Sequence, residues 1–222
     1  MFWSDKIQIT NEDNMELMAR YPDKHFDLAI VDPPYGIGYS ELVGIKKTEH
    51  GFKKRNSSKW DNSIPTKEYF DELFRVSKNQ IIWGGNYFNL KPTRCMLIWD
   101  KVQRIDQADC EIAWTSFNTS ARIFKYARGN ESGFAPKSIQ TDKMFANIHP
   151  TQKPVALYKW LLDKYAKQGD KILDTHFGSG SIAIACHDYG FELTACELDK
   201  EYYDAAIKRI KNHTSQTKLF AL

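Results

Sequence analysis

The sequence predicts one α/β domain over residues 1–222, with a mostly parallel sheet and helices on both faces. Three observations predict this class. The length of 222 residues suits a single sizeable core. Short apolar runs alternate with helix-like stretches. A Gly-rich turn joins a strand to a helix near residue 180. Hydrophobic residues make up 42% and charged residues 27%, which excludes a disordered chain.

The predicted elements follow one another as a doubly wound sheet requires. Apolar, β-rich runs predict seven strands, at 6–10, 27–31, 80–83, 95–99, 110–116, 171–174 and 192–197. Helical patterns predict five helices, at 14–21, 66–76, 154–167, 181–189 and 200–212. Pro154 suits the first turn of its helix, because its missing N–H costs nothing there. Two long irregular stretches remain, 36–64 and 118–148, and we expect them to be functional or mobile.

Composition narrows the class further. Four cysteines show no CxxC spacing, so we expect neither a metal site nor a disulfide framework. Three of them lie in apolar runs, as buried reduced thiols of a cytoplasmic protein do. No run approaches the roughly 18 apolar residues of a membrane span, so we expect a soluble protein with no membrane partner. The net charge of +3 is too small to indicate a nucleic-acid partner by itself.

The Gly-rich turn and the acid after the next strand are typical of a nucleotide-like cofactor site. Glycines let the backbone approach a ligand, and helix N–H groups then face it. A carboxylate at the end of the next strand can accept both hydroxyls of a ribose. No Walker lysine is present, so we expect an adenosine cofactor without a triphosphate, with S-adenosylmethionine first. A structural turn with a surface glutamate is the alternative. The candidate residues are Asp174, Phe177, Gly178, Ser179, Gly180 and Glu197.

The strand at 27–31 ends in an unusually stiff and polar turn, Asp32-Pro33-Pro34-Tyr35. Each proline fixes φ and lacks an N–H, so Pro33 and Pro34 present rigid carbonyl acceptors. Asp32 adds a carboxylate and Tyr35 adds a ring. At the carboxyl end of a central strand, this cluster would face the ligand crevice and suit a flat base held by its exocyclic amine. A plain structural proline turn is the alternative.

Three motifs together resemble one enzyme family: DPPY at 32–35, HPTQKP at 149–154 and FGSG at 177–180. The chain resembles the beta-group DNA amino-methyltransferases, N6-adenine and N4-cytosine enzymes of bacteria and phages, in which the DPPY block also precedes the cofactor block. The resemblance spans about 6–210. It implies a Rossmann-like methyltransferase fold, with a seven-stranded sheet and a circularly permuted motif order. The strand at 6–10 would then supply the strand that is missing after the last helix.

The resemblance also implies cofactor contacts. The HPTQKP turn would contact the methionine end of S-adenosylmethionine, with His149, Thr151 and Lys153 as candidates and Lys153 paired with the carboxylate. Asp13 would contact the adenine of the cofactor. Capping of the helix at 14–21 explains Asp13 equally well, because aspartate prefers that position.

One departure from the family lies beside the Gly-rich turn. The family usually has Asp-Pro-Phe there, whereas Thr175 and His176 follow Asp174 in this chain. This chain therefore lacks the phenylalanine whose aromatic contact the resemblance would imply.

The implied reaction is methyl transfer to N6 of an adenine flipped out of double-stranded DNA. Asp32 and the carbonyl of Pro33 would accept the two N6 hydrogens, which stabilises the charge that develops on nitrogen. Tyr35 would stack on the base. An N4-cytosine enzyme is a close rival, although serine commonly replaces the aspartate there, so Asp32 favours adenine. A catalytically silent nucleic-acid-binding subunit is a second rival, which the two intact motifs oppose.

We expect DNA contacts from a flexible DNA-facing loop at 36–64 and a short target-recognition insertion at 118–148. A solvated basic loop is the alternative for any single cation. Among partners, the resemblance allows a homodimer and a cognate restriction endonuclease. The basic candidates are Lys46, Lys47, Lys53, Lys54, Arg55, Lys59, Arg122, Lys125 and Arg128.

Overall fold

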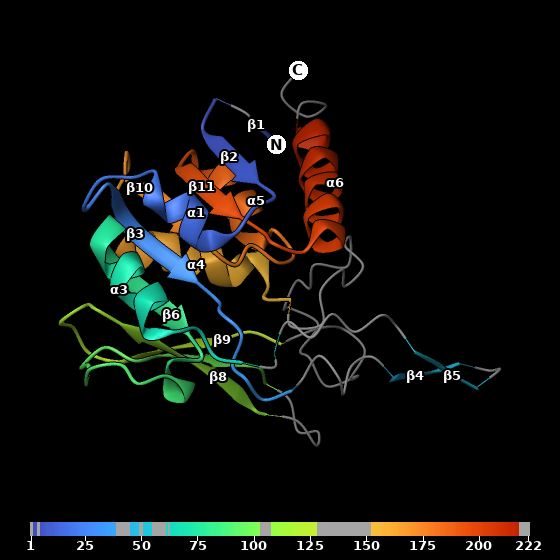
Figure 1. The fold of residues 1–222 in the computed structure, drawn as a ribbon, viewed down its shortest axis with the longest axis horizontal. Helices are drawn as coiled ribbons and strands as arrows, with labels where there is room; N and C mark the ends of the chain where they lie inside the picture. Colours follow the sequence, from blue (N-terminus) through green and yellow to red (C-terminus); the bar gives the residue numbers. More distant parts are fainter. Residues whose placement is uncertain are drawn as a thin grey trace.

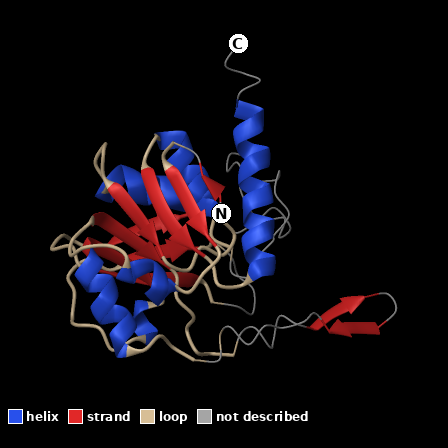
Figure 2. Cartoon of the chain, turned by 45° about the horizontal axis from the view of Figure 1, so that its top comes forward, coloured by secondary structure: helices blue, strands red, loops and turns tan. Residues whose placement is uncertain are grey.

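The computed structural model describes residues 2–3, 5–38, 45–48, 51–54, 61, 63–102, 108–127 and 152–217. Within them, a nine-stranded sheet carries helices on both faces, and a two-stranded hairpin lies apart from it (Figures 1 and 2). Across the sheet the strands are β1 (Phe2–Trp3), β2 (Ile7–Thr10), β11 (Glu192–Cys196), β10 (Lys171–Asp174), β3 (Phe26–Val31), β6 (Ser77–Trp83), β8 (Cys110–Thr115), β7 (Leu97–Asp100) and β9 (Arg122–Lys125). The helices are α1 (Asn14–Ala19), α3 (Lys67–Val76), α4 (Val155–Tyr165), α5 (Ser181–Tyr189), α6 (Lys200–Thr217) and the short 3₁₀ helix η1 (Gly85–Tyr87).

The predicted α/β class and all seven predicted strands are confirmed, each within three residues of its expected bounds. The sheet gains two strands, β1 and β9, and both lie at its edges. β9 reads Arg-Ile-Phe-Lys and is largely exposed, so it lacks the buried alternation by which a strand is recognised. The hairpin of β4 (Ile45–Thr48) and β5 (Gly51–Lys54) lies inside the stretch expected to be irregular. Its lysines interrupt the alternation of apolar and polar residues by which a strand is recognised in a sequence.

The sheet is mostly parallel, as predicted. β2, β11, β10, β3 and β6 run parallel, and β8 runs antiparallel between β6 and β7. β2 pairs with β11, with Ile7 opposite Leu193, so the N-terminal segment completes this half of the sheet as expected. The strand order reverses between β10 and β3: β11 follows β10 on one side of this pair, and β6 follows β3 on the other. Open α/β sheets bind ligands at such a switch point, outside the carboxyl ends of the strands.

Two apolar clusters cover the two faces of the sheet. α4 and α5 pack on one face, where Leu161 and Ile182 are buried. α1 and α3 pack on the other, with Leu17 and Leu73 buried. α5 is buried at every position from 181 to 186, because α4 and α6 both pack against it. All four cysteines are free thiols. None of the helices in the described parts of the chain has the length and apolar character to cross a membrane.

Candidate active site

A cavity of about 970 Å³ opens at the carboxyl ends of β3 and β10, and both predicted motifs line it. Its volume lies at the upper end of the range for small-molecule sites. One wall holds Asp32, Pro33, Pro34 and Tyr35, and another holds Phe177, Gly178, Ser179 and Glu197. Two stretches far apart in the sequence therefore share one cavity.

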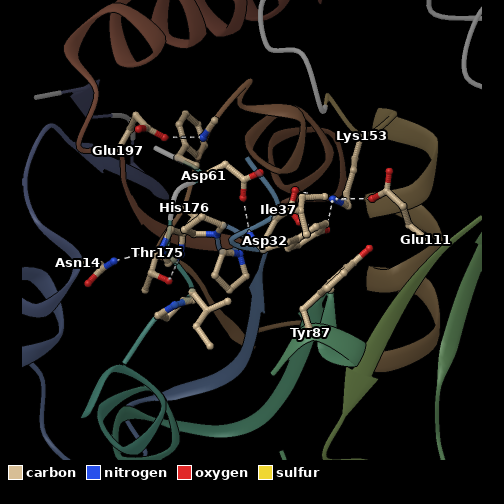
Figure 3. A pocket seen from close by; sticks show the side chains of 18 of the residues that line it. Asn14, Asp32, Ile37, Asp61, Tyr87, Glu111, Lys153, Thr175, His176 and Glu197 are labelled. Atoms are coloured by element: carbon tan, nitrogen blue, oxygen red, sulfur yellow. Dashed lines mark hydrogen bonds and ion pairs between the residues drawn. The ribbon is translucent and has the colours of Figure 1, made fainter. Parts of the chain in front are cut away.

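The Asp32 carboxylate is held on both of its oxygens (Figure 3). The Tyr35 hydroxyl donates to Oδ1 at 2.6 Å, and the Lys153 ammonium pairs with Oδ2. Burial raises the pKa of Asp32, and the charge of Lys153 opposes that rise. Each oxygen keeps a second lone pair, so the carboxylate can still accept a hydrogen bond from a ligand.

A second carboxylate fixes the turn itself. Asp61 is 2% exposed, and its Oδ1 accepts the backbone N–H groups of Tyr35 at 2.7 Å and Gly36 at 3.0 Å. Asp61 lies in the loop at 36–64 and is not among the site residues predicted from the sequence. Its structural role depends on a contact across 26 residues that no local pattern reveals.

Aromatic rings lie beside the Asp32-Pro33-Pro34-Tyr35 turn. Tyr87 of η1 stacks on Tyr35, with ring centroids 5.0 Å apart and planes 15° apart. Gly84 precedes η1 with φ +70°, and a Cβ added there would lie 2.8 Å from Cζ of Tyr35 and closer still to Cδ1 and Cε1. Only glycine allows both that backbone conformation and that approach to the ring.

Lys153 has partners that the sequence did not indicate. Its side chain is 1% exposed, and Nζ lies 3.0 Å from Oε2 of Glu111 on β8 as well as against Asp32. The other oxygen of Glu111 lies 2.8 Å from Nζ of Lys101. In this arrangement Lys153 faces two protein carboxylates, whereas the resemblance implied the carboxylate of the cofactor. The sequence did not indicate Glu111 or Lys101 as site residues. The available signal was an acid inside the apolar run Cys-Glu-Ile-Ala-Trp.

On the opposite wall, Glu197 binds the Gly-rich turn. Its Oε2 accepts the N–H of Gly178 at 2.8 Å, and its Oε1 accepts the N–H of Asp199 at 2.9 Å. Burial raises the pKa of Glu197. Gly178 and Gly180 have φ of +53° and +74°, a region that favours glycine. The turn therefore has the backbone geometry that the sequence predicts.

Behind this turn lies a buried polar group. Asp174 is 2% exposed and does not reach the cavity; its Oδ1 accepts the N–H of His176, and burial raises its pKa to about 8. His176 lines the cavity, with Nε2 3.2 Å from Nδ2 of Asn14 and Nδ1 3.0 Å from Oγ1 of Thr175. Burial lowers the pKa of His176 to about 3, so the ring is neutral. A polar ring thus stands where the resemblance implies phenylalanine.

Asp13 is accounted for by the fold. It caps α1, and its carboxylate accepts the N–H of Met15 at 2.7 Å. Its neighbours Glu12 and Asn14 line the cavity, whereas Asp13 does not. Of the two roles expected for Asp13, the geometry gives capping.

Several predicted residues lie beyond what the structure describes. Five of them are outside the described residues: His149, Thr151, Arg55, Lys59 and Arg128. The strands β4 and β5 hold Lys46, Lys47, Lys53 and Lys54, whose side chains are not described. Arg122 and Lys125 lie on the edge strand β9 and are exposed.

One group of potential metal ligands lies within the described ranges, away from the cavity. It consists of His187, Asp188 and His213, whose ligand atoms lie within 4.8 Å of one another. The Lys159 ammonium is already 2.6 Å from Oδ2 of Asp188, and Nε2 of His213 is 2.6 Å from Oδ1. Side chains of the protein thus already engage both oxygens of Asp188, so we assign this group no metal.

Comparison with known proteins agrees with the motifs. A family model described as DNA methylase, for N6 and N4 enzymes, matches residues 98–208. The type II methyltransferase M2.DpnII of Streptococcus pneumoniae is 26% identical over 170 residues, which are 76% of this chain and 55% of that protein. The chain spans about half the length of the curated relatives it matches.

Solved structures show the same fold. The M1.HpyAVI–SAM complex aligns with a TM-score of 0.56 and 19% identity, over 91% of this chain and 99% of that one. The cytosine-N4-specific PvuII DNA methyltransferase aligns with a TM-score of 0.57 and 12% identity, over 92% of this chain and 86% of that one. Because the family model covers half of the sequence, and both motifs line one cavity, this chain belongs to the N6/N4 family of DNA methylases.

Proposed function

We propose that this chain is a DNA methyltransferase that uses S-adenosylmethionine to methylate N6 of an adenine flipped out of double-stranded DNA. The observation that carries the proposal is the shared cavity, which places the Asp32 carboxylate opposite the Gly-rich turn at Gly178. A cavity with only one of these walls would bind a base or a cofactor, but it could not bring the two together.

The residues of the cofactor wall fit an adenosine group. Glu197 presents a carboxylate beside the turn, as ribose hydroxyls require, and Phe177 offers an apolar ring. Asn14 and neutral His176 add polar atoms that can meet a purine. S-adenosylmethionine, when bound, supplies an electrophilic methyl group on sulfur.

The residues of the catalytic wall fit an exocyclic amine. Such an amine is a poor nucleophile, because its lone pair is delocalised into the ring. Asp32 and the carbonyl of Pro33 would accept its two hydrogens, which directs the lone pair away from the ring plane and stabilises the positive charge as it develops. Holding the nitrogen in line with the methyl group supplies the rest of the rate acceleration. The hydrogen bond from Tyr35 and the ion pair with Lys153 hold Asp32 in one orientation.

Contacts to the phosphate backbone are proposed for the hairpin and the sheet edge. Lys46 on β4 stands opposite Lys53 on β5 in the hairpin register, and like charges at opposed positions are destabilising. A bound phosphate would relieve that repulsion. On β9, Arg122 and Lys125 are exposed and free to reach a phosphate. In Lys46→Ala with Lys53→Ala, we expect weaker DNA binding, a shallower salt dependence and unchanged cofactor affinity.

Cytosine N4 is the alternative target. The cytosine-N4-specific PvuII DNA methyltransferase has the same fold, so the fold does not separate the two bases. Both bases present an amine that the Asp32 cluster could hold. Asp32 favours adenine through the family resemblance. A homodimer, a cognate restriction endonuclease and a cytoplasmic location also stay predictions.

The decisive experiment is methyl transfer to DNA of mixed sequence, with the modified nucleoside identified by mass spectrometry. N6-methyladenine supports the proposal, and N4-methylcytosine would replace it with the alternative. Asp32→Asn keeps the shape of the side chain and should lose transfer while binding S-adenosylmethionine normally. Wild-type protein that binds DNA tightly but yields no methylated nucleoside would indicate a silent binding subunit.

A further inference from the structure

We infer that Glu111 and Lys101 are positioning residues, which set the strength of Asp32 as a hydrogen-bond acceptor by sharing the charge of Lys153. The inference rests on the proposed function and adds two residues to its catalytic machinery. Neither residue belongs to the motifs by which the family was recognised.

The geometry is a chain of alternating charges along the cavity wall, and Figure 3 shows its Glu111–Lys153–Asp32 part. Nζ of Lys101 lies 2.8 Å from Glu111, whose other oxygen lies 3.0 Å from Nζ of Lys153, and Lys153 pairs with Asp32. Lys101 is 5% exposed and Lys153 is 2% exposed, so water screens these pairs poorly. A change in the charge of one group in such a chain changes the electrostatic interactions of the next group.

Lys153 is fixed by more than its ion pairs. Nζ lies 5.2 Å from the centroid of the Trp83 ring and 3.4 Å from the Tyr35 hydroxyl. Its single positive charge is thus divided between Asp32 and Glu111 within a rigid pocket. If Lys153 faced Asp32 alone, it would neutralise that carboxylate more completely, and Asp32 would accept a hydrogen bond from an amine more weakly.

The ionisation of Glu111 agrees with this arrangement. Burial by itself would raise the pKa of Glu111, but Lys153 and Lys101 outweigh it and hold that pKa at about 2. Burial likewise opposes the charge on Lys153, and Asp32 and Glu111 raise its pKa in spite of this. Glu111 and Lys153 are therefore both charged throughout the neutral range.

Other titratable groups near Asp32 are accounted for. Tyr35 donates to it, and Glu111 raises its pKa across Lys153. The charge of Asp32 in turn contributes to the raised pKa values of Tyr158 on α4 and Asp174 at the end of β10. Only Glu111 has a second cation, Lys101, on its far side among the described residues. Substitutions of Glu111 and of Lys101 can therefore shift the pKa of Asp32 in opposite directions.

The two variants make opposite predictions. Glu111→Gln keeps the shape but removes the negative charge, so Lys153 binds Asp32 more tightly and the pKa of Asp32 falls. Lys101→Met removes the counter-charge of Glu111, so Lys153 is drawn away from Asp32 and the pKa of Asp32 rises. Activity requires ionised Asp32, so the acid limb of the rate profile moves to lower pH in the first variant and to higher pH in the second.

The experiment measures kcat and kcat/KM for methyl transfer against pH in both single variants and in the double variant. We expect Glu111→Gln to lower kcat by about ten- to a hundredfold, as misplacement of a reacting group does. The double variant should return the acid limb toward its wild-type position, because it removes a neutral pair. Lys78→Met is the control. It breaks the surface ion pair with Asp27 and should leave the profile unchanged.

A second readout does not depend on turnover. Carboxyl carbon NMR of labelled aspartate follows the titration of Asp32 in the free protein, with the resonance assigned by its loss in Asp32→Asn. Shifts of opposite sign in the two variants support the inference. Shifts of the same sign, or none, overturn it and reduce both residues to a structural role. If the wild-type protein transfers no methyl group, the proposed function fails, while the NMR titration still tests the charge sharing.

Discussion

Gly84→Ala tests whether the Asp32–Tyr35 turn depends on the close approach of the Gly84 backbone to the ring of Tyr35. The substitution adds one methyl group at a residue with φ +70°, directly against the ring of Tyr35. The left-handed conformation costs alanine about 1–2 kcal/mol. Overpacking against a fixed ring adds about 1–3 kcal/mol. Together these give about 3.5 kcal/mol, or a fall in Tm of about 7–14 °C for a domain of this size.

Gly169→Ala is the matched control. Gly169 has φ +90°, but an added Cβ would meet nothing within 4 Å. It therefore carries only the backbone cost of about 1–2 kcal/mol. The difference between the two variants measures the contact with the ring of Tyr35.

Thermal unfolding and methyl transfer, measured well below both Tm values, separate stability from catalysis. We expect Gly84→Ala to lose transfer because the ring of Tyr35 is displaced from Asp32, and Gly169→Ala to keep it. Equal stability losses in the two variants, together with normal transfer in Gly84→Ala, would refute the reasoning.

Three further predictions concern the cofactor wall and the elements behind it. Glu197→Gln should weaken S-adenosylmethionine binding by about tenfold in calorimetry, as loss of a charged hydrogen-bond acceptor does. The exposed Glu192→Gln, at the start of β11, should leave the affinity unchanged; equal affinities of the two variants for the cofactor would remove Glu197 from the site. Asp13→Ala should cost about 1 kcal/mol through loss of the cap of α1, and Asp13→Ser should restore it; a loss of cofactor affinity in both variants would instead indicate a ligand contact. Asp174 has a pKa of about 8 in the fold, above its unfolded value, so its protonated form contributes stability below about pH 4 that is lost as pH rises through 8. Asp174→Asn should therefore raise the Tm more at pH 8 than at pH 5, and an equal effect at both pH values would contradict this assignment.

The sequence predicted the sheet and the two motif walls because both leave local patterns. Apolar strands that end in Asp32 or Asp174 mark the carboxyl edge of the sheet, and parallel pairing brings those ends together. The contacts between walls leave no such pattern. Glu111 on β8 meets Lys153 in the turn before α4, and Asp61 binds the DPPY turn from a loop, so each contact depends on tertiary packing. His176 differs again, since its identity was visible but its neutral, hydrogen-bonded state follows from burial.

The permuted strand order also affects how the polypeptide folds as it is made. β2 has its parallel neighbour in β11, and Thr10 bonds to Ala195 across 185 residues. At ribosomal rates of about 5–20 residues per second, β2 waits about ten to forty seconds for that neighbour. β3 and β6, by contrast, can pair early, because fewer than half as many residues separate them. The cofactor wall is thus assembled after the β3–β6 pair, and β2 stays without its parallel neighbour until β11 has been made.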